Sequence, residues 1–151
     1  TPRSLNFLRI FILRAFGAKL GSKVIVYGSC KVWLPKNLNI KDGSCLGPNT
    51  LVYNVSQVII GANTIISQNC EICTPSHQFD NPSFDLISGN ITIGSNCWIA
   101  SSCFVGPNSI LSDGVILGAH SVTVGRKLDV GVYIGNPAKK VRDRQCIQYL
   151  F

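Results

Sequence analysis

The sequence predicts an all-β solenoid in which short strands wind into stacked triangular turns. Three observations carry this prediction: an aliphatic residue recurs every six positions, only 14% of the residues are charged, and 14 glycines accompany the repeat. An average soluble domain has roughly 25% charged residues. This low content of charged residues excludes a disordered chain, which needs low hydrophobicity and high charge density. The 151 residues are expected to form a single domain over 1–151.

The N-terminal segment, 1–19, is expected to form a short helix that caps the open end of the solenoid, which would otherwise expose sheet edges. The alternative is contact with a membrane surface, because basic apolar helices bind there. We favour the capping role. The stretch is short and interrupted by Arg9 and Arg14, so it does not predict a membrane span. The apolar residues at helical spacing are Leu5, Leu8, Ile12 and Phe16.

The repeat occupies 20–128. A period of six matches neither the helical period of about 3.6 nor a simple alternation. It fits short strands joined by tight corners, with three hexads closing a turn of about eighteen residues. The aliphatic side chains are expected to point inward, and a small residue four positions later fills the remaining interior. The clearest aliphatic series is Ile93, Ile99, Val105, Leu111 and Leu117, and its small partners are Cys97, Cys103, Ser109, Val115 and Ser121.

The cysteines offer two interpretations. Cys70, Cys73 and His77 have a C-x2-C-x3-H spacing that resembles a zinc site. The repeat instead gives several cysteines the role of small inward hydrophobes, so Cys70 and Cys73 would face different sides and no metal is expected. The odd total of seven cysteines favours a reducing, cytoplasmic setting. The cysteines at inward small positions are Cys30, Cys70, Cys97 and Cys103.

The net charge of +7 is concentrated at the two ends of the chain. No Lys or Arg occurs over 42–125, so the middle cannot build the basic stripe that nucleic-acid binding requires. We expect no nucleic-acid partner. The C-terminal basic cluster instead favours a small phosphate-bearing ligand.

The repeat is interrupted once, by an expected loop over 78–92. His77, one of two histidines in the chain, stands at its root. Loops that leave a rigid scaffold often carry function, which makes His77 the leading catalytic candidate.

In several segments the chain resembles the hexapeptide-repeat acyltransferases, whose fold is a left-handed parallel β-helix. Within that family it is similar to the branch of maltose, galactoside and nodulation-factor O-acetyltransferases, and to the colanic-acid-type exopolysaccharide acetyltransferases in particular. The segments that carry the resemblance are Ile60-Gly61-Ala62-Asn63, Cys73-Thr74-Pro75-Ser76-His77, Ile93-Gly94-Ser95-Asn96-Cys97-Trp98-Ile99-Ala100, Gly118-Ala119-His120-Ser121-Val122 and Gly135-Asn136-Pro137-Ala138-Lys139-Lys140-Val141-Arg142.

This resemblance implies transfer of an acetyl group from acetyl-CoA to a sugar hydroxyl of a surface-polysaccharide precursor. His77 would be the general base, a task suited to a neutral imidazole near physiological pH. Its second ring nitrogen needs an acceptor, either a backbone carbonyl or the carboxylate of Asp80 or Asp85. The resemblance also implies a homotrimer with active sites between subunits. The acceptor would contact Asn54, Asp80 and Phe84.

The same resemblance implies an acetyl-CoA site along the coil edges. The backbone N–H of Ser101 would stabilise the oxyanion, and Trp98 would flank the pantetheine arm or serve only as a wall residue. The C-terminal segment, 129–151, would supply basic residues to the nucleotide. The expected cofactor-binding residues are Trp98, Ser101, Ala119, Lys139 and Arg142.

Other functions on this architecture fit less well. A γ-type carbonic anhydrase needs three histidines per zinc, and a structural or ice-binding solenoid would show threonine-rich arrays. Within the acyltransferases, an antibiotic acetyltransferase and an N-acetyltransferase of a nucleotide-linked amino sugar remain alternatives.

Overall fold

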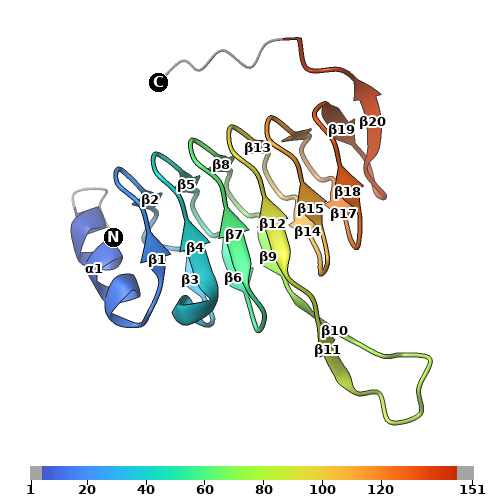
Figure 1. Cartoon of the computed structure of the whole chain (residues 1–151), viewed down its shortest axis with the longest axis horizontal. Coiled ribbons are helices and arrows are strands. Elements are labelled where there is room, and N and C mark those ends of the chain that lie inside the picture. Colours follow the sequence, from blue (N-terminus) through green and yellow to red (C-terminus); the bar gives the residue numbers. More distant parts are fainter. Residues whose placement is uncertain (1–4, 146–151) are drawn as a thin grey trace.

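The computed structural model describes residues 5–145, which form a solenoid with a helix at one end and a hairpin projecting from its side (Figure 1). Its strands are assigned to three walls. The first wall contains β1 (Lys19–Leu20), β4 (Leu38–Ile40), β7 (Val58–Ile60), β12 (Ile91–Ile93), β15 (Ile110–Leu111) and β18 (Lys127–Leu128). The second contains β2 (Ile25–Val26), β5 (Cys45–Leu46), β8 (Ile65–Ile66), β13 (Trp98–Ile99), β16 (Ile116–Leu117), β19 (Val132–Ile134) and the antiparallel β20 (Lys139–Arg142). The third contains β3 (Lys31–Val32), β6 (Leu51–Tyr53), β9 (Glu71–Cys73), β14 (Phe104–Val105) and β17 (Val122–Thr123).

The hexad positions form the interior, as the sequence predicts. Strands of successive turns pair in parallel, so that Ile66 lies beside Ile99 and Ile99 beside Leu117. These three side chains are fully buried. Each aliphatic hexad residue therefore stacks on its equivalent in the next turn, which gives the solenoid one continuous apolar core.

The small hexad positions complete this interior. Cys70, Cys97 and Cys103 are buried, whereas Cys30 is half-buried. The thiols of Cys70 and Cys103 lie 3.0 Å from the carbonyl oxygens of Ala100 and Gly118, respectively. Cysteine here acts as a small hydrophobe that also contacts the backbone of a corner.

The corners between walls require a left-handed backbone conformation. Asparagine tolerates that conformation better than most L-residues, and Asn63, Asn69 and Asn96 have φ values of 54°, 58° and 59°. The corner residues keep the strands as short as two residues and so set the triangular cross-section.

The ends of the solenoid differ from the expected boundaries of 1–19, 20–128 and 129–151. Helix α1 (Asn6–Ala15) packs against β1 and β2, and a short 3-10 helix, η2 (Pro35–Asn37), precedes β4. At the other end β19 still pairs in parallel with β16, because Val132 continues the buried wall. Residues 1–4 and 146–151, including Cys146, lie outside the described part of the chain.

The expected loop over 78–92 is partly regular structure. Strand β10 (Pro75–His77) pairs with β11 (Leu86–Ser88) to form an antiparallel hairpin, and β12 begins at Ile91.

Within residues 5–145 no helix is long and apolar enough to cross a membrane.

Candidate active site

His77 lies at the end of β10, where the hairpin leaves the solenoid, and its side chain is exposed. The base of the hairpin is anchored to the wall. Gly89 donates its N–H to the Thr74 carbonyl at 3.0 Å, and the Ser56 and Ser88 hydroxyl oxygens lie 2.6 Å apart. These bonds hold the root of the hairpin and therefore the position of His77.

Phe84 orients the His77 ring in two ways. The Nδ1 atom of His77 lies 2.9 Å from the Phe84 carbonyl oxygen. The two rings stack with centroids 4.5 Å apart and an interplanar angle of 12°. A carbonyl oxygen only accepts hydrogen bonds, so Nδ1 is the donor, and in the neutral imidazole Nε2 therefore carries the lone pair.

The acceptor for Nδ1 is thus a backbone carbonyl, one of the options that the sequence leaves open. The Asp85 carboxylate instead accepts a hydrogen bond from the Ser83 hydroxyl, and Asp80 is exposed on the hairpin. The backbone geometry that aims the carbonyl includes a φ of 49° at Phe84. Asp80 and Phe84 remain candidates for acceptor contact, since both are exposed beside His77 in the chain.

A cavity of about 430 Å³ lies on the second wall, lined by residues of β13, β16, β19 and β20 and of the corners that follow β8, β13 and β16. It brings together four of the expected cofactor residues. Its apolar floor and small corner residues suit an acyl or pantetheine chain, and one arginine stands at its rim. The lining residues are Ser67, Gln68, Trp98, Ala100, Ser101, Ile116, Gly118, Ala119, Val132 and Arg142.

Trp98 is 48% exposed in this cavity and donates its Nε1–H to the Ser67 hydroxyl at 3.0 Å. This bond fixes the indole plane against the wall. Ser101 and Ala119 occupy equivalent corner positions in adjacent turns, because β13 and β16 pair in register. The backbone N–H of Ser101 has no hydrogen-bond partner among residues 5–145.

The expected basic residues divide between two positions on β20. Arg142 lines the cavity, whereas Lys139 is exposed on the same strand and outside the lining. Arg144 belongs to the C-terminal basic cluster but was not among the expected cofactor residues. Its guanidinium donates to the carbonyls of Asn96 at 2.7 Å and Gly114 at 2.9 Å, which ties the C-terminal segment to the corners of the second wall.

Asn54 requires a correction. It is fully buried, where its Oδ1 accepts from the Leu34 N–H at 3.0 Å and its Nδ2 donates to the Leu34 carbonyl at 2.8 Å. The residue holds two turns of the wall together and does not reach a ligand, so the expectation that it contacts the acceptor sugar is wrong.

Sequence reasoning missed Ser67 and Gln68, which belong to the same column of corners as Ser101 and Ala119. The signal was present, because Ile66 is a hexad position and Ser67 directly follows it. The hairpin inserted between the two turns lengthens the spacing along the chain and hides the equivalence of the two corners.

The hairpin and the cavity lie at different edges of one chain. Figure 1 shows the hairpin leaving on the side away from β8 and β13. No residue of the hairpin lines the cavity.

Within residues 5–145 no group of three or more His, Cys, Asp or Glu side chains could hold a metal ion.

Comparisons with known proteins connect this geometry to a family. No family model matches the chain. The chain is 37% identical over 145 residues to WcaF of Escherichia coli (strain K12), which is assigned to colanic acid biosynthesis as an acetyltransferase, and the match covers 95% of this chain and 79% of WcaF.

Solved structures share the fold. A maltose O-acetyltransferase from Clostridium difficile 630 has a TM-score of 0.85 at 23% identity and covers 95% of this chain and 78% of its own. A hexapeptide-repeat acetyltransferase from Vibrio cholerae, solved with acetyl coenzyme A, has a TM-score of 0.74 at 21% identity and covers 91% of this chain and 76% of its own. The predicted left-handed parallel β-helix and the family resemblance are both confirmed. The chain belongs to the hexapeptide-repeat acetyltransferases of the colanic-acid type.

Proposed function

We propose that the protein transfers an acetyl group from acetyl-CoA to a sugar hydroxyl, with His77 as the general base and the active site completed between subunits of a homotrimer. The observation that carries this proposal is the His77 ring, whose Nδ1 is 2.9 Å from the Phe84 carbonyl. That contact leaves Nε2 free to accept a proton.

The proposed chemistry balances without another reactant. The acceptor oxygen attacks the thioester carbonyl carbon while Nε2 of His77 takes the hydroxyl proton. When the carbon–sulfur bond breaks, the imidazolium returns the proton to the leaving thiolate. The unpartnered N–H of Ser101 supports a role in stabilising the oxyanion, because a preorganised backbone donor stabilises charge as it develops.

The cavity on the second wall fits the donor. Trp98, Ile116 and Val132 supply apolar surface, and the small side chains at Gly118 and Ala119 leave room at the corner for a ligand. Arg142 at the rim suits a phosphate group. Lys139 is proposed to act further out, at the nucleotide end.

The trimer is proposed because, within one chain, the two halves of the site lie apart. We call them the hairpin half-site, which holds His77, and the cavity half-site, which is the cavity on the second wall. His77 of one subunit would face the cavity of its neighbour, as closed cyclic symmetry allows. The acceptor class is proposed from WcaF, which is assigned to colanic acid biosynthesis, with Asp80 and Phe84 as its contacts. The buried thiols of Cys70, Cys97 and Cys103 support a reducing, cytoplasmic setting.

The test is release of the CoA thiol from acetyl-CoA by wild-type protein, His77→Ala and His120→Asn. Acceptors are free sugars, nucleotide sugars, lipid-linked oligosaccharides, amino sugars and acetylatable antibiotics. We expect His77→Ala to stay folded and to lose turnover by at least about a hundredfold.

His120→Asn is the matched control, because it changes the other histidine at a corner whose φ of 59° asparagine tolerates. It should keep its turnover. Normal turnover in His77→Ala would contradict the mechanism, and preference for an antibiotic would contradict the acceptor class.

A further inference from the structure

The helix at the N-terminal end of the solenoid turns both apolar and polar side chains toward the protein: Ile10 and Leu13 pack against the core, and Asn6 and Arg14 bind backbone groups. Asn6 donates to the Val24 carbonyl and accepts from the Val26 N–H, both at 2.9 Å. Arg14 donates to the Leu20 carbonyl at 2.7 Å. These bonds satisfy backbone groups at the open end of the first turn, so α1 is attached partly through polar contacts.

The opposite face of α1 is apolar and exposed, and no residue of the helix is buried. The outward face of a helix on a water-facing surface is normally polar, so this apolar outer face is unusual. The side chains at positions 7, 8, 11 and 12 lie on one face of the helix, because residues three and four apart are neighbours on a helix surface. The exposed apolar side chains are Phe7 at 71%, Leu8 at 44%, Phe11 at 68%, Ile12 at 45% and Phe16 at 70% exposure.

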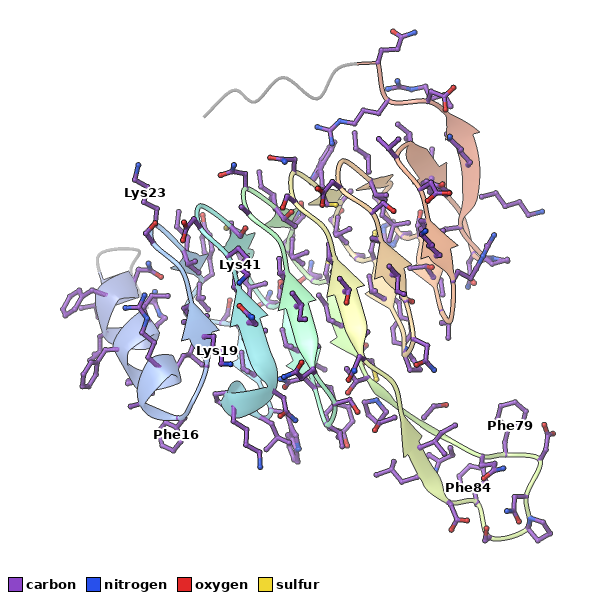
Figure 2. The ribbon with its side chains drawn as sticks, in the orientation of Figure 1. Phe16, Lys19, Lys23, Lys41, Phe79 and Phe84 are labelled. Atoms are coloured by element: carbon purple, nitrogen blue, oxygen red, sulfur yellow. The ribbon has the colours of Figure 1, made fainter. Side chains whose placement is uncertain are left out.

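Positive charge predominates at the end of the molecule that carries this apolar face, although Asp42 lies beside Lys19 and Lys41 there. Residues 1–41 contain eight Lys and Arg and no Asp or Glu. Figure 2 shows Phe16, Lys19, Lys23 and Lys41 at the same end of the molecule, and the three lysines are exposed. A face of this sign repels a second copy of itself and attracts an anionic surface.

We propose that this end of the solenoid, α1 with the lysines of the first turns, binds an anionic lipid membrane surface. The aromatic side chains would enter the boundary between headgroups and acyl chains, while the lysines contact the anionic headgroups. Capping and membrane contact are then served by opposite faces of one helix. The proposal is independent of the proposed acetyl transfer, since none of these residues belongs to the hairpin or the cavity.

The test is co-sedimentation of the 151-residue protein with phosphatidylcholine vesicles, with and without phosphatidylglycerol. We expect binding to the vesicles that contain phosphatidylglycerol and a fall in binding as salt is raised. Absence of binding, or equal binding to both vesicle types, would overturn the proposal.

Two double variants separate the apolar and electrostatic contributions. Phe7→Ser with Phe11→Ser, and Lys19→Gln with Lys23→Gln, should each lower the vesicle partition coefficient about tenfold or more. Phe79→Ser is the matched control, because Phe79 is an equally exposed aromatic at 75% on the distant hairpin (Figure 2). It should bind like wild type.

Two further measurements keep the outcomes distinct. CoA-thiol release with a water-soluble acceptor should be unchanged in both double variants, so failure of membrane binding is separable from failure of catalysis. Sedimentation velocity without lipid tests whether the apolar face instead joins copies of the protein. A smaller assembly in the phenylalanine variant than in wild type would overturn the proposal in favour of that contact.

Discussion

Phe84 determines how His77 is presented, through its carbonyl and through its ring. Phe84→Ala keeps the carbonyl and removes the stacked ring. We expect kcat to fall about tenfold, because small losses of orientation at a catalytic group are costly, while KM for acetyl-CoA stays the same. Steady-state kinetics checks this, with Phe79→Ala as the control. An unchanged kcat would show that the carbonyl alone is sufficient.

Cys97 links stability to alkaline pH. Burial raises the pKa of its thiol to about 11, from 9.0 for a free thiol. The folded protein therefore holds this proton more tightly than the unfolded chain. The stabilisation is complete below pH 9 and is lost as the pH rises to about 11, a loss of roughly 2–3 kcal/mol.

Urea unfolding of wild type and Cys97→Ala across this pH range isolates the effect from other titrating groups. We expect the difference in unfolding free energy between the two proteins to shrink as the pH rises through the window. A difference that stays constant would mean that the thiol does not contribute.

At the level of single residues, the sequence singled out His77 as a catalytic candidate but did not predict what surrounds it. His77 stood out because it interrupts a regular pattern. The role of the Phe84 carbonyl could not be predicted, because its direction depends on a backbone conformation that no residue pattern indicates. Asn54 was misassigned because a polar residue at a corner looks the same in sequence whether its amide meets a ligand or the next turn.

The corners limit which residues each turn accepts. A Cβ added at Gly61 would lie 2.4 Å from the backbone carbon of Gly94 and from the Ser95 nitrogen. Backbone atoms of the next turn cannot move aside like a flexible side chain, so Gly61→Ala should lower the unfolding free energy by about 3 kcal/mol.

Gly125→Ala is the matched control, since a Cβ at Gly125 meets nothing within 4 Å. Its φ of 62° still costs about 1 kcal/mol. Chemical denaturation of both variants measures the two effects. Equal losses would mean that the close approach of turns is not what requires glycine at position 61.

The strands of the solenoid were predictable because every turn needs an inward aliphatic residue at each sixth position, so the same pattern appears in the sequence once per turn and can be recognised from its repetition. The hairpin occurs once. All three residues of β11 are exposed, so no burial pattern distinguishes them from a loop. The same hairpin also separated Ser67 from its corner column, so one irregular element caused both omissions.

For the whole molecule, the proposed division of the active site between subunits makes a quantitative prediction. His77→Ala destroys the hairpin half-site. Ala119→Trp fills the cavity half-site at an exposed corner, where a large side chain has room and the fold should persist. Each variant alone should lose turnover. Co-expressed in equal amounts, the two chains should mix at random within the proposed trimers.

A site built from two neighbouring chains works when one supplies His77 and the other an open cavity. Half of the hairpins and half of the cavities are intact, so about one quarter of the sites should be active. CoA-thiol release from the purified mixed trimers should therefore recover to about a quarter of the wild-type rate per chain. If both half-sites met within one chain, every site would carry one defect and mixing would restore nothing. Recovery thus tests the division of the site directly, because neither variant contains an intact copy of both halves.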